Sequence, residues 1–201
     1  MRIDLPHRLI FLRHGETDWN AEGRLQGQKD IGLNSKGLEQ SARAALKIKK
    51  LLRRMQLDDK HLHFVASPLS RTRNTMHIVR THLGLSEQDY HTDPRLKELS
   101  FGQWQGLTWP EVQMQAPLEA KAREIDKWGF VPPKGESYAM LAERVRPWLE
   151  SLNQDTCVVA HGGIARVLLV LLADMPIERA PLVQIWQDRP ILFADGSFNW
   201  I

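Results

Sequence analysis

A histidine and an arginine stand together in Arg13-His14-Gly15, which directly follows the apolar run Leu9-Ile10-Phe11-Leu12. Histidine is a nucleophile near neutral pH, and arginine binds phosphate through two parallel N–H bonds. We therefore expect His14 to attack a phosphorus atom that Arg13 holds in place. The predicted position suits this chemistry, because ligands of open α/β folds bind at the carboxyl ends of strands.

Three further segments carry side chains of the same kinds. Arg71 follows a second apolar run and lies at the start of a predicted helix, where free N–H groups attract anions. His161 ends another apolar run and is followed by two glycines, and Glu98 lies on a loop between these segments. Phosphoryl transfer needs a nucleophile, cations for the phosphoryl oxygens and a proton donor for the leaving oxygen. The combined set therefore predicts phosphoryl transfer.

In their order along the chain, these segments resemble the motifs of the histidine phosphatase superfamily, also called the phosphoglycerate mutase-like family. The matching residues are 12–20, 24–33, 67–72, 96–106, 135–137 and 160–163. The resemblance implies that His14 becomes phosphohistidine and that Glu98 donates a proton to the leaving group. It also implies a phosphate site made of Arg13, Asn20, Gln26, Arg71, His161 and the backbone N–H of Gly162. Neither a metal nor a cofactor is implied.

The local sequence after Glu98 favours one branch of this family. Residues 100–106 read Ser-Phe-Gly-Gln-Trp-Gln-Gly, where phosphoglycerate mutases of the family carry a tyrosine-glycine pattern. We therefore expect a metal-independent phosphomonoesterase of the histidine acid phosphatase type that acts on a small phosphorylated metabolite. The alternatives are a cofactor-dependent phosphoglycerate mutase and a non-catalytic relative that binds a phosphorylated ligand. The non-catalytic alternative is weakened because all five core residues are present.

Substrate choice is expected to depend on groups around this core. The candidates for contact with a second anionic group, a sugar or a base are Arg24, Lys29, Trp104, Trp109, Arg123, Lys127 and Lys134. The alternative for each is a solvated charge or an aromatic ring that packs the lid, since surface charges are mostly solvated.

Composition limits the class of protein. The 201 residues are 42% hydrophobic and 25% charged, as is ordinary for a globular domain. The net charge of +3 is small and its charges are scattered, which favours an anionic metabolite over nucleic acid. The N-terminus lacks a signal peptide and no apolar run could span a bilayer, so we expect a cytoplasmic protein without a membrane partner. The single cysteine, Cys157, excludes an intramolecular disulfide.

Hydrophobic periodicity predicts alternating strands and helices. Strands are expected at 7–12, 61–66, 90–93 and 156–160, with a hairpin at 195–196, and helices at 36–54, 67–82, 108–115, 117–127, 136–152 and 164–173. This order predicts an α/β sandwich, and the family resemblance implies three α/β/α layers around a mostly parallel sheet. We expect one domain over residues 1–201 with a lid-like insertion at about 107–135. The apolar run Ile191-Leu192-Phe193 is expected to form either a sheet edge or a homodimer contact.

Overall fold

The computed structural model describes residues 2–201, apart from the side chain of residue 60. Its helices and strands follow in the order β1 (Leu9–Arg13), α1 (Asp18–Ala21), α2 (Ser35–Arg54), β2 (His63–Ala66), α3 (Ser70–Leu83), β3 (His91–Thr92), α4 (Trp109–Gln115), α5 (Pro117–Ile125), α6 (Tyr138–Glu150), β4 (Thr156–Ala160), α7 (Gly162–Ala173), β5 (Ile191–Ala194) and β6 (Ser197–Trp200). The predicted alternation is confirmed. Helix α1 was not predicted, because four residues are too few to show a helical repeat.

A six-stranded sheet in the order β3-β2-β4-β1-β5-β6 forms the centre of the molecule. The first four strands of this order are parallel, and β5 and β6 form an antiparallel hairpin. Asp195 and Gly196 at its turn have φ values of 50° and 68°, as a tight hairpin requires. The mostly parallel sheet is therefore confirmed. The predicted sheet edge at Ile191-Leu192-Phe193 is wrong, because β5 lies between β1 and β6 and the edge strand is β6.

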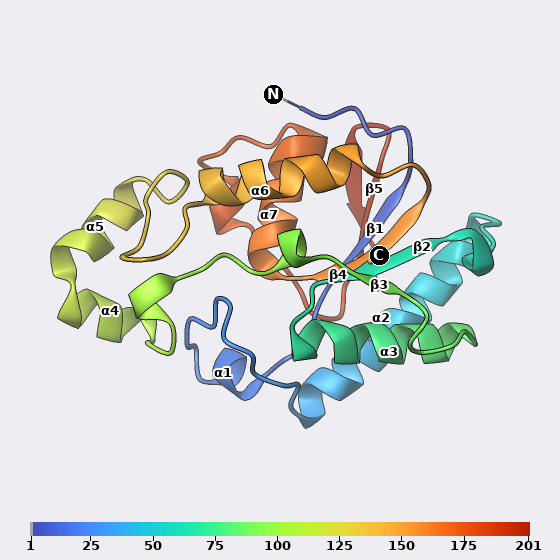
Figure 1. Cartoon of the computed structure of the whole chain (residues 1–201), viewed down its shortest axis with the longest axis horizontal. Coiled ribbons are helices and arrows are strands. Elements are labelled where there is room, and N and C mark those ends of the chain that lie inside the picture. Colours follow the sequence, from blue (N-terminus) through green and yellow to red (C-terminus); the bar gives the residue numbers. More distant parts are fainter. Residues whose placement is uncertain (1) are drawn as a thin grey trace.

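Helices cover both faces of this sheet, as Figure 1 shows. Val158 and Val159 are neighbours in β4, so their side chains point to opposite faces. Val158 packs in a core with Trp148 of α6, and Val159 packs in a second core with Ile48 of α2. All five residues of β4 are buried, as expected for a parallel strand covered on both sides. The three-layer α/β/α architecture is thus confirmed.

The predicted start of the helix after β2 is wrong. The helix expected to open at Ser67-Pro68 begins at Ser70, and Leu69 before it is extended, with φ −71° and ψ 144°. The backbone N–H of Ser67 still donates to the carbonyl of Val159 in the neighbouring strand, at 3.0 Å. Because this ladder continues past the end of β2, Pro68 lies in the turn between strand and helix.

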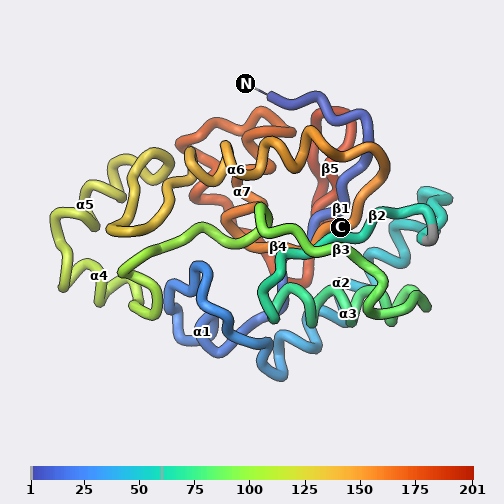
Figure 2. Tube along the Cα trace, viewed as in Figure 1, coloured from blue at the N-terminus to red at the C-terminus, as the bar shows by residue number. Residues whose placement is uncertain are grey.

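Helices α4 and α5 project from one side of the molecule (Figure 1). They pack around a small core of their own, formed by Trp104, Val112 and Ala120. The loop after β1 runs beside the segment that leads into α4 (Figure 2), and an antiparallel bridge joins Arg24 to Thr108. The residues that follow His14 are therefore tied directly to the 107–135 segment.

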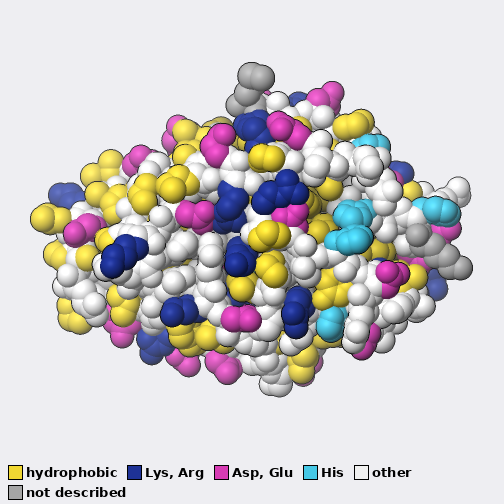
Figure 3. Space-filling model, viewed as in Figure 1, with side chains coloured by type: hydrophobic (Ala, Val, Ile, Leu, Met, Phe, Trp, Pro, Cys, Tyr) yellow, Lys and Arg dark blue, Asp and Glu magenta, His cyan; other side chains and the backbone are white. Residues whose placement is uncertain are grey.

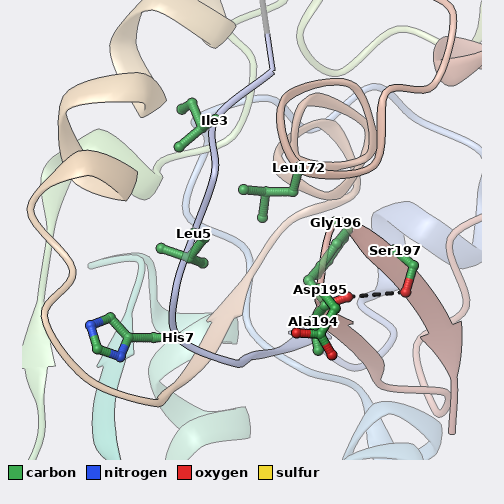
Figure 4. Close-up of a pocket in the computed structure, with 9 residues that line it drawn as sticks. Ile3, Leu5, His7, Leu172, Ala194, Asp195, Gly196 and Ser197 are labelled. Atoms are coloured by element: carbon green, nitrogen blue, oxygen red, sulfur yellow. Dashed lines mark hydrogen bonds between the residues drawn. The ribbon is translucent and has the colours of Figure 1, made fainter.

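A small hollow lies near the amino end of β1. It lies between the N-terminal segment, α7 and the β5–β6 turn, with Ile3, Leu5 and Leu172 among its lining residues (Figure 4). Its volume of about 10 Å³ leaves room for no more than about one water molecule. The predicted site residues belong to the opposite side, at the carboxyl ends of the strands, where Arg13 ends β1 and Ala160 ends β4.

The face of the molecule shown in the space-filling view has no patch made of side chains of one charge alone. Lys and Arg side chains stand among acidic and uncharged ones (Figure 3). Within residues 2–201, no helix combines the length and the hydropathy that crossing a membrane would require.

Candidate active site

The two histidines of the predicted site emerge from neighbouring parallel strands. Arg13 ends β1 and pairs with Ala160, which ends β4. His14 and His161 are the next residues, so both leave the sheet at the same edge. Their ring centroids lie 5.2 Å apart with the ring planes at 64°. The structure thus brings the two histidines together as predicted.

His14 is held in one tautomer. Its Nδ1 lies 2.7 Å from the carbonyl oxygen of Gly15, and its Nε2 lies 3.2 Å from Nε of Arg71. Because an arginine N–H can only donate, Nε2 must accept and Nδ1 must carry the proton. Burial, followed by the charges of Arg71 and Arg13, holds the pKa of His14 well below its ordinary 6.5. His14 is therefore neutral, with its lone pair on Nε2.

Arg71 is fully buried in the first turn of α3. Besides its contact with His14, it donates from Nη1 to the carbonyl of Lys29 at 2.7 Å and from Nη2 to that of Gly27 at 2.8 Å. Burial lowers its pKa to about 10, so it stays charged at neutral pH. These contacts fix the guanidinium plane against the ring of His14.

Arg13 is the second cation of the site. Its Nη1 donates to the carbonyl of Ile185 at 2.8 Å, while its buried Nε has no hydrogen-bond partner among the described residues. Burial and the charge of Arg166 lower its pKa to about 10. Arg13 thus remains a cation with a donor still available to a ligand.

His161 is the N-cap of α7, which begins at Gly162 and not at the predicted Ile164. The glycines therefore form the first turn of the helix, where the backbone N–H groups point towards an anion. Nε2 of His161 lies 2.8 Å from Oγ of Ser67, and its buried Nδ1 has no partner among the described residues. This strand-to-helix turn can therefore offer both a side-chain and a backbone donor.

Glu98 comes from the loop after a short 3-10 helix, Pro94–Leu96. Both of its carboxylate oxygens lie 3.1 Å from the backbone N of Gly163, and one accepts from the N–H of Leu99 at 2.8 Å. A Cβ atom on Gly163 would collide with Oε1 of Glu98, so a larger residue here would displace that carboxylate. The structure places the predicted proton donor at the start of α7, beside the helix that His161 caps.

The loop segment that carries Glu98 is held by a partly buried ion pair. Arg144 of α6 binds Glu136 at 2.9 Å and donates to the carbonyls of Lys97 and Glu98 at 3.0 and 3.3 Å. Sequence reasoning did not identify this pair, since neither residue stands at the end of a strand. It fixes the backbone of Glu98 without contacting its carboxylate.

Asn20 and Gln26, the predicted supplementary phosphate ligands, lie on the segment that follows His14. The side-chain oxygen of Asn20 accepts from Gln187 at 3.0 Å and from the N–H of Thr17 at 3.3 Å, which leaves its amide N–H groups to donate elsewhere. Gln26 is buried, and its Oε1 has no partner among the described residues. Gln26 directly precedes Gly27, whose carbonyl accepts from Arg71.

Two candidates for substrate specificity are engaged in other contacts. Arg24 pairs with Glu22 at 2.6 Å and with Glu111 at 3.5 Å. Trp104 is buried and stacks on Phe130 with ring centroids 5.6 Å apart. Arg24 is thus ion-paired with two carboxylates, and Trp104 packs within the lid-like segment, as the alternative for an aromatic candidate predicts. Two other candidates, Lys29 and Lys134, have exposed side chains.

Arg123 and Arg166 form a second group of cations. Arg123 lies over the rings of Phe101 and Trp109, at 5.8 and 5.2 Å from their centroids. Arg166 donates to the carbonyl of Val183 at 3.1 Å and lies 3.4 Å from the hydroxyl of Tyr138. Among residues 2–201, neither arginine has a carboxylate partner within ion-pair distance.

Arg166 was missed at the level of sequence, although a signal was present. It is the only charge within the apolar helix 162–173, one turn after Gly162. An ideal Cβ on Gly162 would lie 3.3 Å from Nη1 of Arg166 and 3.7 Å from Nε of Arg13. The two guanidinium groups therefore flank the same glycine.

Metal ligands are not gathered in the described part of the chain. No group of three or more His, Cys, Asp or Glu side chains is arranged there to hold a metal ion. His63 and His91 stack with ring centroids 5.4 Å apart, but they belong to β2 and β3 at the far edge of the sheet.

Comparison with known proteins gives a consistent result. Residues 9–189 match the family model described as histidine phosphatase superfamily (branch 1). Glucosyl-3-phosphoglycerate phosphatase of Mycolicibacterium vanbaalenii is 32% identical over 207 residues, covering 96% of this chain and 82% of that one. A 2,3-bisphosphoglycerate-dependent phosphoglycerate mutase of Parvibaculum lavamentivorans is 28% identical over 199 residues, covering 94% and 90%. A mycobacterial glucosyl-3-phosphoglycerate phosphatase complexed with VO3 is similar in structure, with a TM-score of 0.79, 29% identity and 97% of both chains covered.

Proposed function

The chain belongs to the histidine phosphatase superfamily and is a phosphomonoesterase, and we propose that it hydrolyses small phosphorylated metabolites through a phosphohistidine on His14. The observation that carries this proposal is the fixed tautomer of His14, whose Nε2 lone pair faces the guanidinium of Arg71. A neutral imidazole beside a buried cation is equipped to attack an anionic phosphoryl group. Arg13, Arg71, His161, Asn20, Gln26 and the N–H of Gly162 hold the phosphoryl oxygens.

In the first step, Nε2 of His14 attacks phosphorus and the bond from phosphorus to the ester oxygen breaks. The electron pair of that bond passes to the leaving oxygen, which takes a proton from the carboxyl group of Glu98. The alcohol leaves and the phosphoryl group stays on His14. Arg71 supports this step because its Nε, released from Nε2, can donate to a phosphoryl oxygen instead.

In the second step, water attacks the phosphorus atom of phosphohistidine. Glu98, now a carboxylate, takes a proton from that water, and the electron pair of the P–N bond returns to Nε2. Inorganic phosphate leaves, and both His14 and Glu98 regain their initial protonation. General acid–base help of this kind contributes about 10²–10⁴-fold to a rate.

A phosphoglycerate mutase is the second candidate, favoured by the 28% identical mutase relative. The two activities share the first step and differ in the acceptor of the phosphoryl group. In a mutase, a second hydroxyl of the substrate replaces water. Product analysis therefore separates the two candidates.

The natural substrate carries a second anionic group. Arg166 and Arg123 lack carboxylate partners in residues 2–201, and Arg166 lies next to Arg13. Carboxylate and phosphate are the groups that arginine binds bidentately. The relative's substrate, glucosyl-3-phosphoglycerate, has such a carboxylate in its glycerate part. Because Arg123 belongs to α5, the 107–135 segment acts as a lid that brings one of these cations to the substrate.

The test is a phosphate-release screen over phosphosugars, phosphoglycerates, nucleotides and α-ribazole phosphate. Each substrate is assayed with the wild type and with His14→Ala, with and without a chelator. We expect phosphate release by the wild type, and a loss of at least about 10³-fold in kcat for His14→Ala. Labelling with ³²P should give an acid-labile phosphoenzyme in the wild type alone.

Three outcomes would contradict the proposal. Equal turnover by His14→Ala would exclude His14 as the nucleophile. Loss of activity with the chelator would exclude a metal-independent mechanism. Conversion of 3-phosphoglycerate to its 2-isomer, with little phosphate released, would assign the chain to the mutase branch.

A further inference from the structure

The hydroxyl of Ser67 contacts one ring nitrogen of His161, and the other ring nitrogen of His161 has no partner among the described residues. Ser67 directly follows β2, and its Oγ lies 2.8 Å from Nε2 of His161. Neither residue has any exposed surface. We propose that Ser67 is a positioning residue: its hydroxyl donates to Nε2 of His161 and thereby places the ring proton on Nδ1, where it donates to the transferred phosphoryl group. This inference rests on the proposed function of the same site.

The direction of this hydrogen bond follows from the partners available. Among residues 2–201, Nε2 of His161 is the one hydrogen-bond partner of the Ser67 hydroxyl. If Nε2 carried the ring proton, the hydroxyl would have to accept, and its own proton would be buried without an acceptor. Leaving a buried donor unpaired costs about 1–3 kcal/mol. With the hydroxyl as donor, that proton is satisfied, and the ring proton belongs to Nδ1.

The nitrogen on the other side of the ring is placed to meet the phosphoryl group. Nδ1 of His161 is buried and has no partner among the described residues, like Nε of Arg13. The ring packs edge-on against that of His14, with centroids 5.2 Å apart. An N–H at Nδ1 therefore gains an acceptor when phosphoryl oxygens lie between the histidines and Arg13. A lone pair at the same position would repel those oxygens.

The choice of tautomer matters because the ring is neutral. Burial, followed by the charges of Arg71, His14 and Arg13, holds the pKa of His161 well below 6.5. A neutral imidazole has a single N–H, so it cannot serve both Ser67 and the phosphoryl group as donor. Ser67 must therefore donate if His161 is to help in the reaction.

The test compares Ser67→Ala and Ser67→Cys with the wild type. We measure kcat and KM for an aryl phosphate, the inhibition constant of vanadate, and the ¹⁵N NMR signals of the histidine rings, with His161 identified through His161→Gln. In metal sites, loss of the hydrogen bond that orients a ligating histidine costs about 10–100-fold in activity, and we take this range as the guide for His161. We expect such a loss in kcat and a similar weakening of vanadate for Ser67→Ala. Ser67→Cys, which keeps a weak donor, should fall between it and the wild type.

The NMR spectra and a double mutant separate positioning from a merely structural role. In the wild type, Nδ1 of His161 should give the signal of a protonated ring nitrogen, and Ser67→Ala should lose this preference. Adding Ser67→Ala to His161→Gln should cost no further activity. Thr156→Ala is the matched control, because Thr156 is also a buried hydroxyl of this sheet but lies at the opposite end of β4. It should lower stability without a change in kcat.

Failure of the proposed role of Ser67 can be distinguished from failure of the proposed function. A wild type that releases no phosphate from any ester would overturn the proposed function, while the NMR spectrum would still test the tautomer. A proton on Nε2 in the wild type would overturn the role of Ser67. The same conclusion follows if Ser67→Ala keeps wild-type kcat, or if its effect persists in full on the His161→Gln background.

Discussion

Arg71 donates its Nε–H directly to Nε2 of His14, across 3.2 Å. A single contact thus joins a fixed cation to the nitrogen that we propose as the nucleophile. It lowers the pKa of His14 together with burial, and it defines which nitrogen holds the lone pair. Nη1 and Nη2 of Arg71 each donate to a backbone carbonyl of the loop after β1, and these bonds hold the cation beside His14.

We expect Arg71→Lys to lower kcat by about 10²–10³-fold, the cost of removing one directed donor from a site of developing charge. Lysine keeps the charge but has no planar set of donors that can reach His14, Lys29 and Gly27 together. Steady-state kinetics with an aryl phosphate measure the effect. Arg73→Lys, an exposed position in the same helix, is the control and should leave kcat unchanged. Wild-type kcat in Arg71→Lys would show that charge alone suffices.

Folding stability should fall with decreasing pH below about 6.5. The pKa values of His14 and His161 lie well below 6.5 in the folded chain, so the unfolded chain binds protons there that the folded chain does not. Each histidine lowers the free energy of unfolding by at most about 1.4 kcal/mol per pH unit in this range. Asp93 and Asp155 have pKa values lowered from the ordinary 3.8. Their effect on stability therefore falls at lower pH than the effect of the histidines.

Urea unfolding of the wild type and His161→Gln between pH 7.5 and 5 measures this dependence. The slope should be shallower in the variant by about one proton. Equal slopes in the two proteins would mean that His161 is protonated in the folded state.

The residues that sequence reasoning located well are those that directly follow strands. Parallel neighbours place the next residues at one edge, so His14 and His161 could be paired before any contact was known. Arg166 could not be found in this way, because it lies one turn inside α7 and does not directly follow a strand. The start of α3 was misplaced because Ser67 continues the ladder to β4, a long-range contact that local propensity does not contain. The same contact brings its hydroxyl to His161.

Gly37→Ala should destabilise the fold by about 1–3 kcal/mol, as expected when a methyl group is forced into a packed site. A Cβ there would collide with the backbone oxygen of Glu16, on the loop that carries His14. Gly32→Ala is the matched control, because no atom lies within 4 Å of its Cβ position. It should change stability by less than about 0.5 kcal/mol. Urea unfolding of both variants measures the difference in stability. Equal unfolding midpoints for Gly37→Ala and Gly32→Ala would refute the predicted collision.

Glu98→Gln should separate the two chemical steps. Glutamine keeps the shape and can still accept from Gly163, but it has no proton to give and cannot act as a base. Alkyl phosphates should lose about 10²–10⁴-fold in kcat, whereas an aryl phosphate with an acidic phenol needs less help in the first step. Rapid mixing with the aryl phosphate should then show a burst of phenol and an accumulating phosphoenzyme. Without a burst, Glu98 would have no role in the hydrolysis step.

Arg166→Ala should lower the activity on a substrate with a second anionic group more than the activity on a simple phosphate ester. A hydrogen bond to a charged group contributes about 1.5–3 kcal/mol, so kcat/KM for a phosphoglycerate ester should fall by about 10–100-fold. An aryl phosphate without a second anion should lose much less, because Arg13 and Arg71 still bind its phosphoryl group.

Arg24→Ala is the control, since Arg24 is already paired with Glu22 and Glu111. If Arg166→Ala leaves the ratio of the two kcat/KM values unchanged, the second anionic group does not bind there, and Arg166 serves only to anchor α7 to Val183.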